Sequence, residues 1–226
     1  MSTPKPERGA STPRPAPGVA TLHALRPATY ARTMTPPTAA PAPFQHAVET
    51  LRRALDGDPG RPGLVLEDMP APQRLAPYSA AVAATVTRDG AEVAAGRLIL
   101  LYDPDGHSGW DGDFRAVAYV SADLEPEIAA DPLVGSVAWS WLIEALEPIG
   151  YAGVSGTITR AVSESFGDKA DEPATTELEL RASWSPVGDV DISGHVAAWC
   201  EVLCQAAGLP PSGVSAIPPR PASSGM

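Results

Sequence analysis

Three stretches of the sequence place apolar residues at the spacing of an amphipathic α-helix, over residues 44–55, 131–147 and 193–207. Ordinary helix signals bound them. Gly57 follows the first, the cap sequence Asp131-Pro132 opens the second, and Gly208 ends the third. The core-facing stripe of the third stretch leaves His195 off its apolar side. We therefore expect three helices, each burying one face.

Alternating and β-branched stretches predict strands between these helices. Residues 79–87 and 91–102 flank an Asp-Gly turn, which predicts a hairpin, and 114–120, 156–164 and 175–184 predict three further strands. Residues 63–68 would add a sixth strand. The order α-(β)-β-β-β-α-β-β-α predicts an α+β fold, an antiparallel sheet of five or six strands with about three helices mainly on one face.

Prolines are concentrated at the two ends of the chain. Of the 26 prolines, ten lie within residues 1–43 and five lie after Leu209. Segments rich in Pro, Ala, Ser and Thr bury too little apolar surface to offset their chain entropy. We therefore expect a disordered leader over 1–42, one domain over 43–210 and a disordered tail over 211–226. Met34 is a hypothetical true start, and the alternative is a flexible basic arm over 1–33.

The charge is strongly negative once the leader is set aside. The whole chain carries −11, residues 1–33 carry +4, and the remainder therefore carries −15. Such an acidic domain repels phosphate backbones and anionic lipids, so we expect neither a nucleic-acid partner nor a membrane-surface role. No apolar run reaches the ~18 residues of a membrane span. With two cysteines and no signal peptide, the sequence predicts a cytoplasmic protein.

The order of several motifs resembles one family. They are Glu67-Asp-Met-Pro-Ala-Pro-Gln-Arg-Leu-Ala-Pro77, Trp110-Asp-Gly-Asp-Phe-Arg115, Trp139-Ser-Trp141, Ser155-Gly-Thr-Ile-Thr-Arg160, Ser163-Glu-Ser-Phe-Gly167 and Arg181-Ala-Ser-Trp184. This run is similar to an actinobacterial family catalogued as domain of unknown function number three thousand, over nearly all of residues 43–220. The resemblance implies a bacterial source with a high GC content, and it implies no activity. The element order alone also resembles type III secretion chaperones and YbjN-like domains, which are binding modules that often dimerise.

The loop from Asp103 to Asp113 is the richest candidate site. Its aspartates are hard-cation ligands, but the pattern lacks the spacing of a calcium loop, and Asp and Gly are also what a tight turn needs. We therefore predict no metal site. Trp110, Asp111, Asp113 and Arg115 suggest a recognition patch, with Trp110 either folded back on the core or exposed to a partner. Asp111 or Asp113 would then pair with Arg115 or Arg97.

Two arginines interrupt the apolar faces of predicted strands. Arg97 shares a face with Val93, Ala95, Ile99 and Leu101, and Arg160 shares one with Ile158 and Val162. A charge in such a position is paired or lines a pocket. One interpretation pairs each arginine with a carboxylate such as Glu164 or Asp113, and the other has them bind an anionic ligand.

Two tryptophans and two cysteines lie within the predicted helices. Trp139 and Trp141 are about 200° apart around their helix, so one packs on the sheet and the other meets another element, solvent or a second subunit. A homodimer through one of them is a hypothesis. Cys200 and Cys204 lie on the apolar stripe of the last helix and predict buried thiols rather than zinc ligands.

No pattern of catalytic residues appears in the sequence. Gly153-Val-Ser155-Gly-Thr157 misses the nucleophile-elbow motif at its last position, and no glycine-rich phosphate loop or cofactor motif is present. We therefore favour a protein-binding or adaptor domain without a catalytic site. The alternative is a small-molecule-binding or weakly enzymatic domain with a pocket lined by arginines. An apolar patch near Trp139 or Trp141 would favour the first, and a deep pocket containing the arginines would favour the second.

Overall fold

The structure, a computed structural model, describes residues 40–72, 74–188 and 191–210. Residues 1–39 of the predicted leader, the hypothesis about Met34 and the predicted tail all lie outside the described residues. The helices and strands follow one another as α1 (Ala42–Asp56), β1 (Leu64–Met69), β2 (Tyr78–Arg88), β3 (Ala91–Tyr102), β4 (Phe114–Leu124), α2 (Pro126–Ala129), α3 (Val134–Leu146), β5 (Tyr151–Ser163), β6 (Thr175–Pro186) and α4 (Ile192–Ala206).

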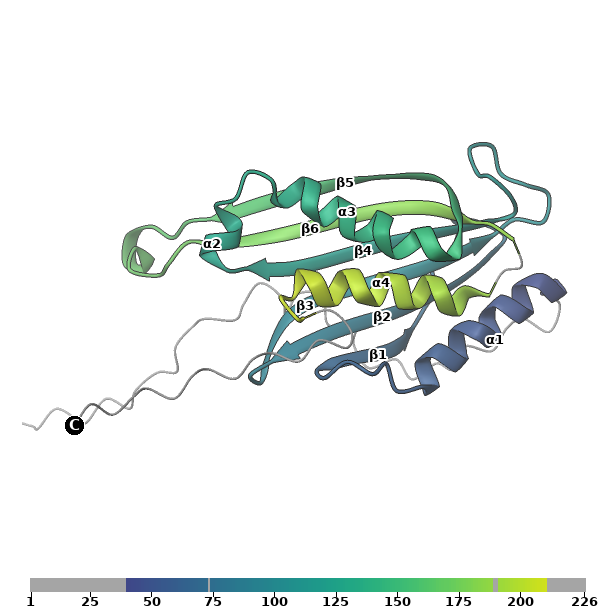
Figure 1. Cartoon of the computed structure of the whole chain (residues 1–226), viewed down its shortest axis with the longest axis horizontal. Helices are drawn as coiled ribbons and strands as arrows, with labels where there is room; N and C mark the ends of the chain where they lie inside the picture. The colour runs from purple at the N-terminus through teal and green to yellow at the C-terminus, as the bar shows by residue number, and fades with distance from the viewer. Residues whose placement is uncertain (1–39, 73, 189–190, 211–226) are drawn as a thin grey trace, which may run out of the picture. The chain divides into compact units, whose positions relative to one another are not determined.

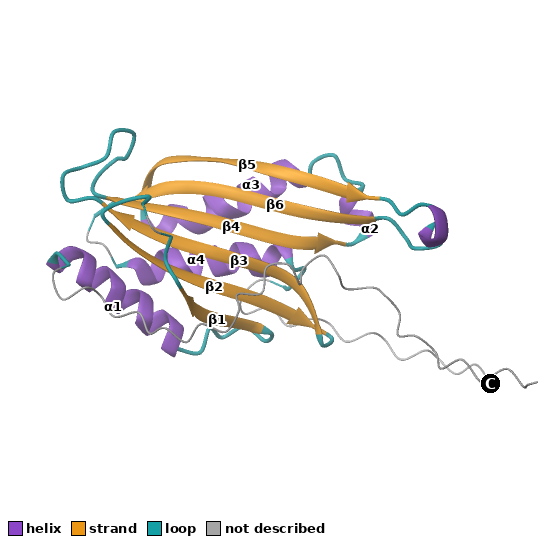
Figure 2. Ribbon diagram, turned by 180° about the vertical axis from the view of Figure 1, so that it is seen from behind, coloured by secondary structure: helices purple, strands orange, loops and turns teal. Residues whose placement is uncertain are grey.

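The six strands form one antiparallel sheet in the order β1-β2-β3-β4-β6-β5. The predicted α+β class is confirmed, and so is the optional sixth strand, which is β1. Helices α1, α4 and α3 lie along one face of the sheet, as Figure 1 shows. Seen from behind, in Figure 2, the strands lie in front of α3 and α4, and no described helix covers this second face.

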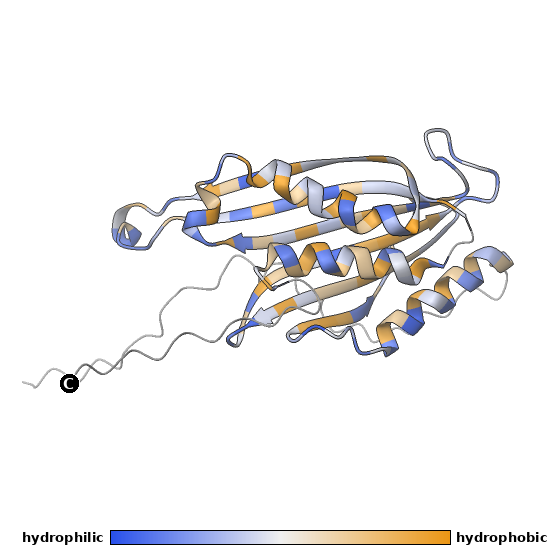
Figure 3. Ribbon diagram, viewed as in Figure 1, coloured by the Kyte–Doolittle hydropathy of each residue, from blue (hydrophilic) through white to orange (hydrophobic). Residues whose placement is uncertain are grey.

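The hydrophobic core lies between the sheet and its helices. The largest fully buried side chains include Trp184 of β6 and Trp199 of α4. In Figure 3, apolar residues follow α4 and the strands beneath it, while the loop between β3 and β4 is mainly hydrophilic. The alternation predicted for β6 is confirmed, since Leu178, Leu180 and Trp184 are buried and Arg181 is exposed.

Helix α4 is buried on more sides than its apolar stripe predicts, because it packs between α1 and α3. The placement of His195 off the buried side was therefore wrong. His195 is 4% exposed, and its Nδ1 accepts a hydrogen bond of 3.1 Å from Nε1 of Trp184. An indole nitrogen can only donate, so Nδ1 carries no proton and the imidazole is neutral.

A glycine lets α4 approach the sheet closely. Trp199 lies against Gly96 of β3, where an added Cβ would stand 2.9 Å from Cζ2 of the indole and 2.9 Å from the Tyr119 carbonyl oxygen. The indole Nε1 donates to that same carbonyl at 3.3 Å. The absence of a side chain at residue 96 therefore sets the distance between the helix layer and the centre of the sheet.

The second predicted helix begins slightly later than its cap sequence suggests. Helix α3 starts at Val134, and the Asp131 carboxylate accepts a hydrogen bond from the backbone N–H of Leu133 at 2.8 Å.

Among the described residues, no helix has the length and apolar character that crossing a membrane requires.

Candidate functional site

The face of the sheet that no described helix covers carries two of the predicted site residues, Arg97 and Arg115, and we call it the open face. Alternate residues of β3 and β4 point to it, including Arg97, Arg115 and Tyr119, while their neighbours Leu98, Ala116 and Val120 are buried under the helices. Because directly opposed residues of antiparallel strands share a face, the register extends this surface onto β6.

The centre of the open face is a stack of two arginines on a tyrosine. Arg97, Tyr119 and Arg181 are directly opposed on β3, β4 and β6. Each guanidinium carbon lies 5.5 Å from the centre of the Tyr119 ring, a cation–π distance. The Tyr119 hydroxyl donates to Glu179 at 3.2 Å, and Arg181 forms an ion pair of 2.7 Å with the same carboxylate. Burial raises the pKa of Tyr119, and the charge of Glu179 raises it further, so the phenol stays protonated.

Arg97 differs from its neighbours in the stack. Its side chain is half-buried, and its guanidinium makes no hydrogen bond or ion pair with any residue that the structure describes. The interpretation that Arg97 pairs with a carboxylate such as Glu164 or Asp113 is therefore wrong, and the interpretation that it binds an anionic ligand stays open. Its one described electrostatic contact is the cation–π contact with the ring of Tyr119.

A pair of carboxylates lies beyond the stack on the same face. Asp123 of β4 is directly opposite Glu177 of β6, and Glu177 accepts a hydrogen bond from the Ser121 hydroxyl. Asp123 is exposed as a residue, but partial desolvation of its carboxyl group raises its pKa, and the charge of Glu177 adds to this. Within the described part of the chain, no cation forms an ion pair with either carboxylate.

Arg115 lies at the other end of the open face and is satisfied internally. It is 8% exposed, and its Nη2 donates to the Ser183 carbonyl at 3.2 Å and to the Ser183 hydroxyl at 2.7 Å. Burial lowers its pKa, and the nearby Asp111 carboxylate opposes this shift. The backbone N–H of Asp111 donates to the Ser185 hydroxyl at 3.1 Å, which holds the loop against β6. Arg115 therefore helps to hold the loop between β3 and β4 against β6, and its guanidinium is not available to a ligand.

The tryptophan of this loop takes neither predicted position. Trp110 is half-buried and stacks on His107 of the same loop, with ring centres 4.8 Å apart. Asp113 is exposed, and its carbonyl accepts the backbone N–H of Asp103 at 2.9 Å to close the loop. No group of three or more His, Cys, Asp or Glu side chains suited to a metal ion occurs in the residues described.

Arg160 and Glu164 lie away from the open face. The Arg160 guanidinium donates to the carbonyl oxygens of Ala129 and Asp131 at 3.2 and 3.0 Å, so it holds β5 to the segment that joins α2 and α3. Its partners are carbonyl oxygens where the sequence suggested a carboxylate. Arg97 and Arg160 consequently lie on opposite faces of the sheet and do not line one pocket.

The two tryptophans of α3 both pack inside this molecule. Trp139 lies over Gly156 of β5, where an added Cβ would stand 2.8 Å from its ring. Trp141 is half-buried against the hydrophobic core. The proposed homodimer through these residues is untested by this packing.

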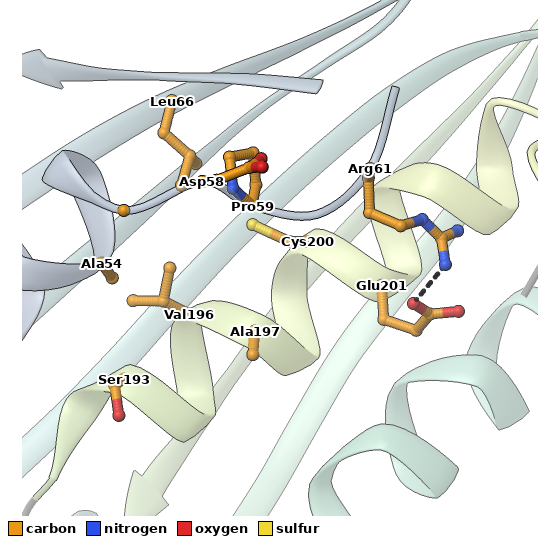
Figure 4. Close-up of a pocket in the computed structure, with 11 residues that line it drawn as sticks. Ala54, Asp58, Pro59, Arg61, Leu66, Ser193, Val196, Ala197, Cys200 and Glu201 are labelled. Carbon is orange, nitrogen blue, oxygen red and sulfur yellow. Dashed lines mark hydrogen bonds and ion pairs between the residues drawn. The ribbon is translucent and has the colours of Figure 1, made fainter. Parts of the chain in front are cut away.

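A cavity of about 380 Å³ lies on the helix side, between α1, α4 and the segment before β1. Figure 4 shows Leu66, Val196 and Cys200 around it, with the Arg61–Glu201 ion pair of 3.1 Å at one end. It contains none of the residues that the sequence suggested for a site. Burial raises the pKa of Cys200 to about 12, so its thiol is a poor nucleophile.

Both thiols are buried, as predicted, and should resist labelling. With the pKa of Cys200 raised from 9.0 to about 12, its thiolate fraction falls about 1,000-fold, and burial raises the pKa of Cys204 as well. We expect Ellman's reagent at pH 8 to label neither thiol in the native protein and both in denaturant. Fast labelling of a native thiol, followed by absorbance, would contradict this packing.

The family model described as "Protein of unknown function (DUF3000)" matches residues 40–215, and the chain belongs to this family. No curated protein and no solved structure matches the chain. The predicted family is thus confirmed, and the topological resemblance to type III secretion chaperones and YbjN-like domains stays a prediction.

Proposed function

We propose that this member of the DUF3000 family is a cytoplasmic protein-binding domain without a catalytic site, and that the open face is its docking surface. The observation that carries the proposal is a set of three charges on one face, one positive and two negative, that have no described counter-ion. Arg97 has no described counter-ion at the centre, and Asp123 and Glu177 have none at one end. The partner is a protein segment that presents a carboxylate to Arg97 and a lysine or arginine to the carboxylate pair.

The contact with Tyr119 orients the Arg97 guanidinium before a carboxylate binds. Contact with Tyr119 holds the guanidinium in place, so less side-chain entropy is lost on binding. Its neighbours on β2 and β3 include Ala83 and Ala95, which are too small to cover it. Arginine and tyrosine are also the residue types that most often dominate the energy of protein interfaces.

Asp123 and Glu177 together favour the binding of a cation from the partner. Like charges directly opposite each other destabilise a sheet. Desolvation raises the pKa of Asp123, and the charge of Glu177 opposite it raises the pKa further. A lysine or arginine between the two carboxylates would remove the repulsion. Asp123 is four residues from Tyr119 along β4, and Tyr119 is opposite Arg97, so the two opposite charges of the partner segment are separated by about 13 Å along the strand direction.

The small-molecule alternative has less support in this arrangement. It requires the arginines to converge on one pocket, but Arg97 and Arg160 lie on opposite faces and Arg115 is bonded to Ser183. A broad face with separated charges suits a protein segment better than a metabolite.

The test compares capture by variants of the open face with matched controls. Full-length wild type, Arg97→Met and Asp123→Asn/Glu177→Gln are used to capture proteins from native lysate, with Arg53→Met and Glu144→Gln as controls on the helix side. We expect the same partner to be lost about tenfold or more with both open-face variants, as for a lost charged hydrogen bond, and retained with the controls.

A photoreactive residue locates the contact directly. Placed at Ala95, beside Arg97, it should crosslink that partner, whereas placed at the exposed Ala197 of α4 it should not. Capture that is unchanged by Arg97→Met and by the carboxylate substitutions, or crosslinking from Ala197 alone, would refute the open face as the docking surface.

A further inference from the structure

Strand β5 is an edge of the sheet with little protection. It has 13 residues and pairs with β6 on one side, and no described strand pairs with its other side, where the loop between α2 and α3 rises beside it in Figures 1 and 2. Natural edge strands are shortened or carry charges and prolines that prevent pairing with another chain. The opposite edge, β1, follows this rule, with six residues that include Glu67 and Asp68. In β5 the only charged residue is Arg160, and it has no proline.

Exposed apolar side chains accompany this edge. Val162 of β5 is 64% exposed, and Phe166, three residues beyond the strand, is 78% exposed. Leu133 is 61% exposed and lies two residues from Asp131, whose carbonyl binds Arg160. The backbone of Phe166 is extended, with φ −131° and ψ 167°, so the chain can continue the direction of the strand. A long free edge with large exposed apolar groups marks an interaction surface.

We propose that β5 pairs with β5 of a second copy of this chain, antiparallel and about a two-fold axis at Val162, to make one continuous sheet. This inference goes beyond the proposed function and does not depend on it, because the edge and the open face are different surfaces. In this register Arg160 is opposite Glu164 of the second copy, and Ile158 is opposite its Phe166. These side chains alternate with Ala161 and Ser163, so they share one face.

Charge complementarity selects the register. Directly opposed side chains share a face, so the two-fold axis must pass through a residue that is opposite itself. An axis at Arg160 would oppose two arginines, which is unfavourable. An axis at Ala161 would put Glu164 opposite the apolar Ile158. The axis at Val162 forms the Arg160–Glu164 pair twice and brings the two exposed valines together.

The existing contacts of Arg160 are compatible with this pair. Both of its carbonyl contacts, to Ala129 and Asp131, come from Nη1. A guanidinium has five N–H donors, so others serve the incoming carboxylate. Glu164 is exposed beside the end of β5, where a second copy can reach it. The interface thus lies at the strand edge and not at Trp139 or Trp141.

Cysteine crosslinking tests the register in the full-length chain. At the axis, the Cα atoms of Val162 and its symmetry mate are about 4.5–5.5 Å apart, within the range of a disulfide. We expect Val162→Cys to form a disulfide-linked dimer under mild oxidation. The matched control is Thr159→Cys, which lies about 20 Å from its own mate and should stay monomeric on a non-reducing gel. Buried Cys200 and Cys204 should give no background.

Sedimentation equilibrium in physiological salt supplies the second readout. We expect wild type to be dimeric at micromolar concentration, and Val162→Lys and Glu164→Arg to raise the dimer Kd at least about tenfold through like-charge contacts. The exchange Arg160→Glu/Glu164→Arg restores the pair and should restore the dimer. Circular dichroism checks that each variant is folded.

Four results would overturn the proposal. Wild-type protein that stays monomeric up to submillimolar concentration would refute the proposed dimer. Equal disulfide crosslinking of Val162→Cys and Thr159→Cys would refute the proposed register, in which Val162 is opposite itself. A dimer unaffected by Val162→Lys places the interface elsewhere, and a strand of another protein found crosslinked at residue 162 shows that the edge serves a different partner. Arg97→Met should leave the mass unchanged, which separates this test from that of the open face.

Discussion

Lowering the pH from 7 to 4 should destabilise the folded domain by about 3 kcal/mol through His195 alone. Burial lowers the pKa of this histidine from 6.5 to about 4, with the charge of Asp191 opposing the shift. Between these values the unfolded chain binds a proton that the folded chain excludes. Stability due to the neutral imidazole is therefore complete above about pH 6.5 and is lost as the pH falls toward 4.

Burial is the main reason why the folded state excludes the proton, and the hydrogen bond from Trp184 also opposes protonation. The indole N–H occupies Nδ1, so protonation there would break a buried bond and place two N–H groups against each other. Urea denaturation at intervals from pH 7 to pH 4.5 measures the effect. We expect the free energy of unfolding to fall by up to about 1.4 kcal/mol per pH unit in this window.

The variant His195→Gln isolates the contribution. Its side-chain carbonyl can accept the Trp184 N–H, but it does not titrate. We expect a shallower dependence on pH than in wild type. Other groups act in both variants, since Asp191 has a lowered pKa and Asp123 a raised one. Equal slopes for wild type and His195→Gln would show that His195 is not the group responsible.

Removing the indole of Trp199 should have the largest effect of any single substitution in the helix layer. The side chain is fully buried, contacts Gly96 and donates to the Tyr119 carbonyl. Trp199→Ala leaves a large cavity and removes the hydrogen bond to the Tyr119 carbonyl oxygen, and we expect a loss of about 3–5 kcal/mol. Trp199→Phe keeps much of the ring and should remain folded for comparison.

The contact between Trp199 and Gly96 can be tested by a double-mutant cycle. Gly96→Ala places a methyl group 2.9 Å from the indole and should cost about 1–3 kcal/mol by overpacking. In the Trp199→Ala background the same methyl group meets less resistance, so its cost should be smaller. Chemical denaturation of the four proteins gives the coupling energy. If the free-energy effects of the two substitutions were additive, residue 96 and the Trp199 indole would not be in energetically significant contact.

The elements of the fold follow from local patterns. The Asp-Gly turn joins β2 to β3 as the alternation on both sides indicates, and Gly57 and Gly208 follow helices. Such signals act over a few residues, so the chain need not be folded for them to be recognised. The confirmed family match rests on the same kind of local motifs.

The pairing of the last two strands could not be predicted in this way. β6 enters the interior beside β4 and leaves β5 at the edge, although β5 comes first in the sequence. The bulky alternating side chains of β6 fill the core under α4, whereas β5 is rich in Gly, Ser and Thr and is largely exposed. This choice depends on which strand packs better against the helices.

For the candidate site, the sequence identified Arg97 as out of place on an apolar strand face and left two interpretations open, a carboxylate partner or an anionic ligand. Its partner in the folded chain is the ring of Tyr119, because the register of β3 and β4 puts them directly opposite each other. The second arginine of the stack, Arg181, and the carboxylates Asp123 and Glu177 were not among the predicted site residues. Their position together is a product of strand order.

Periodicity, turn residues and charge were therefore sufficient for the α+β class, the extents of most elements and the acidity of the chain, since each is set by neighbouring residues. The open face, the burial of His195, the different environments of Arg97, Arg115 and Arg160, and the free edge of β5 required the tertiary structure. Each depends on contacts between residues distant in sequence, and strand register and helix packing alone bring those residues together.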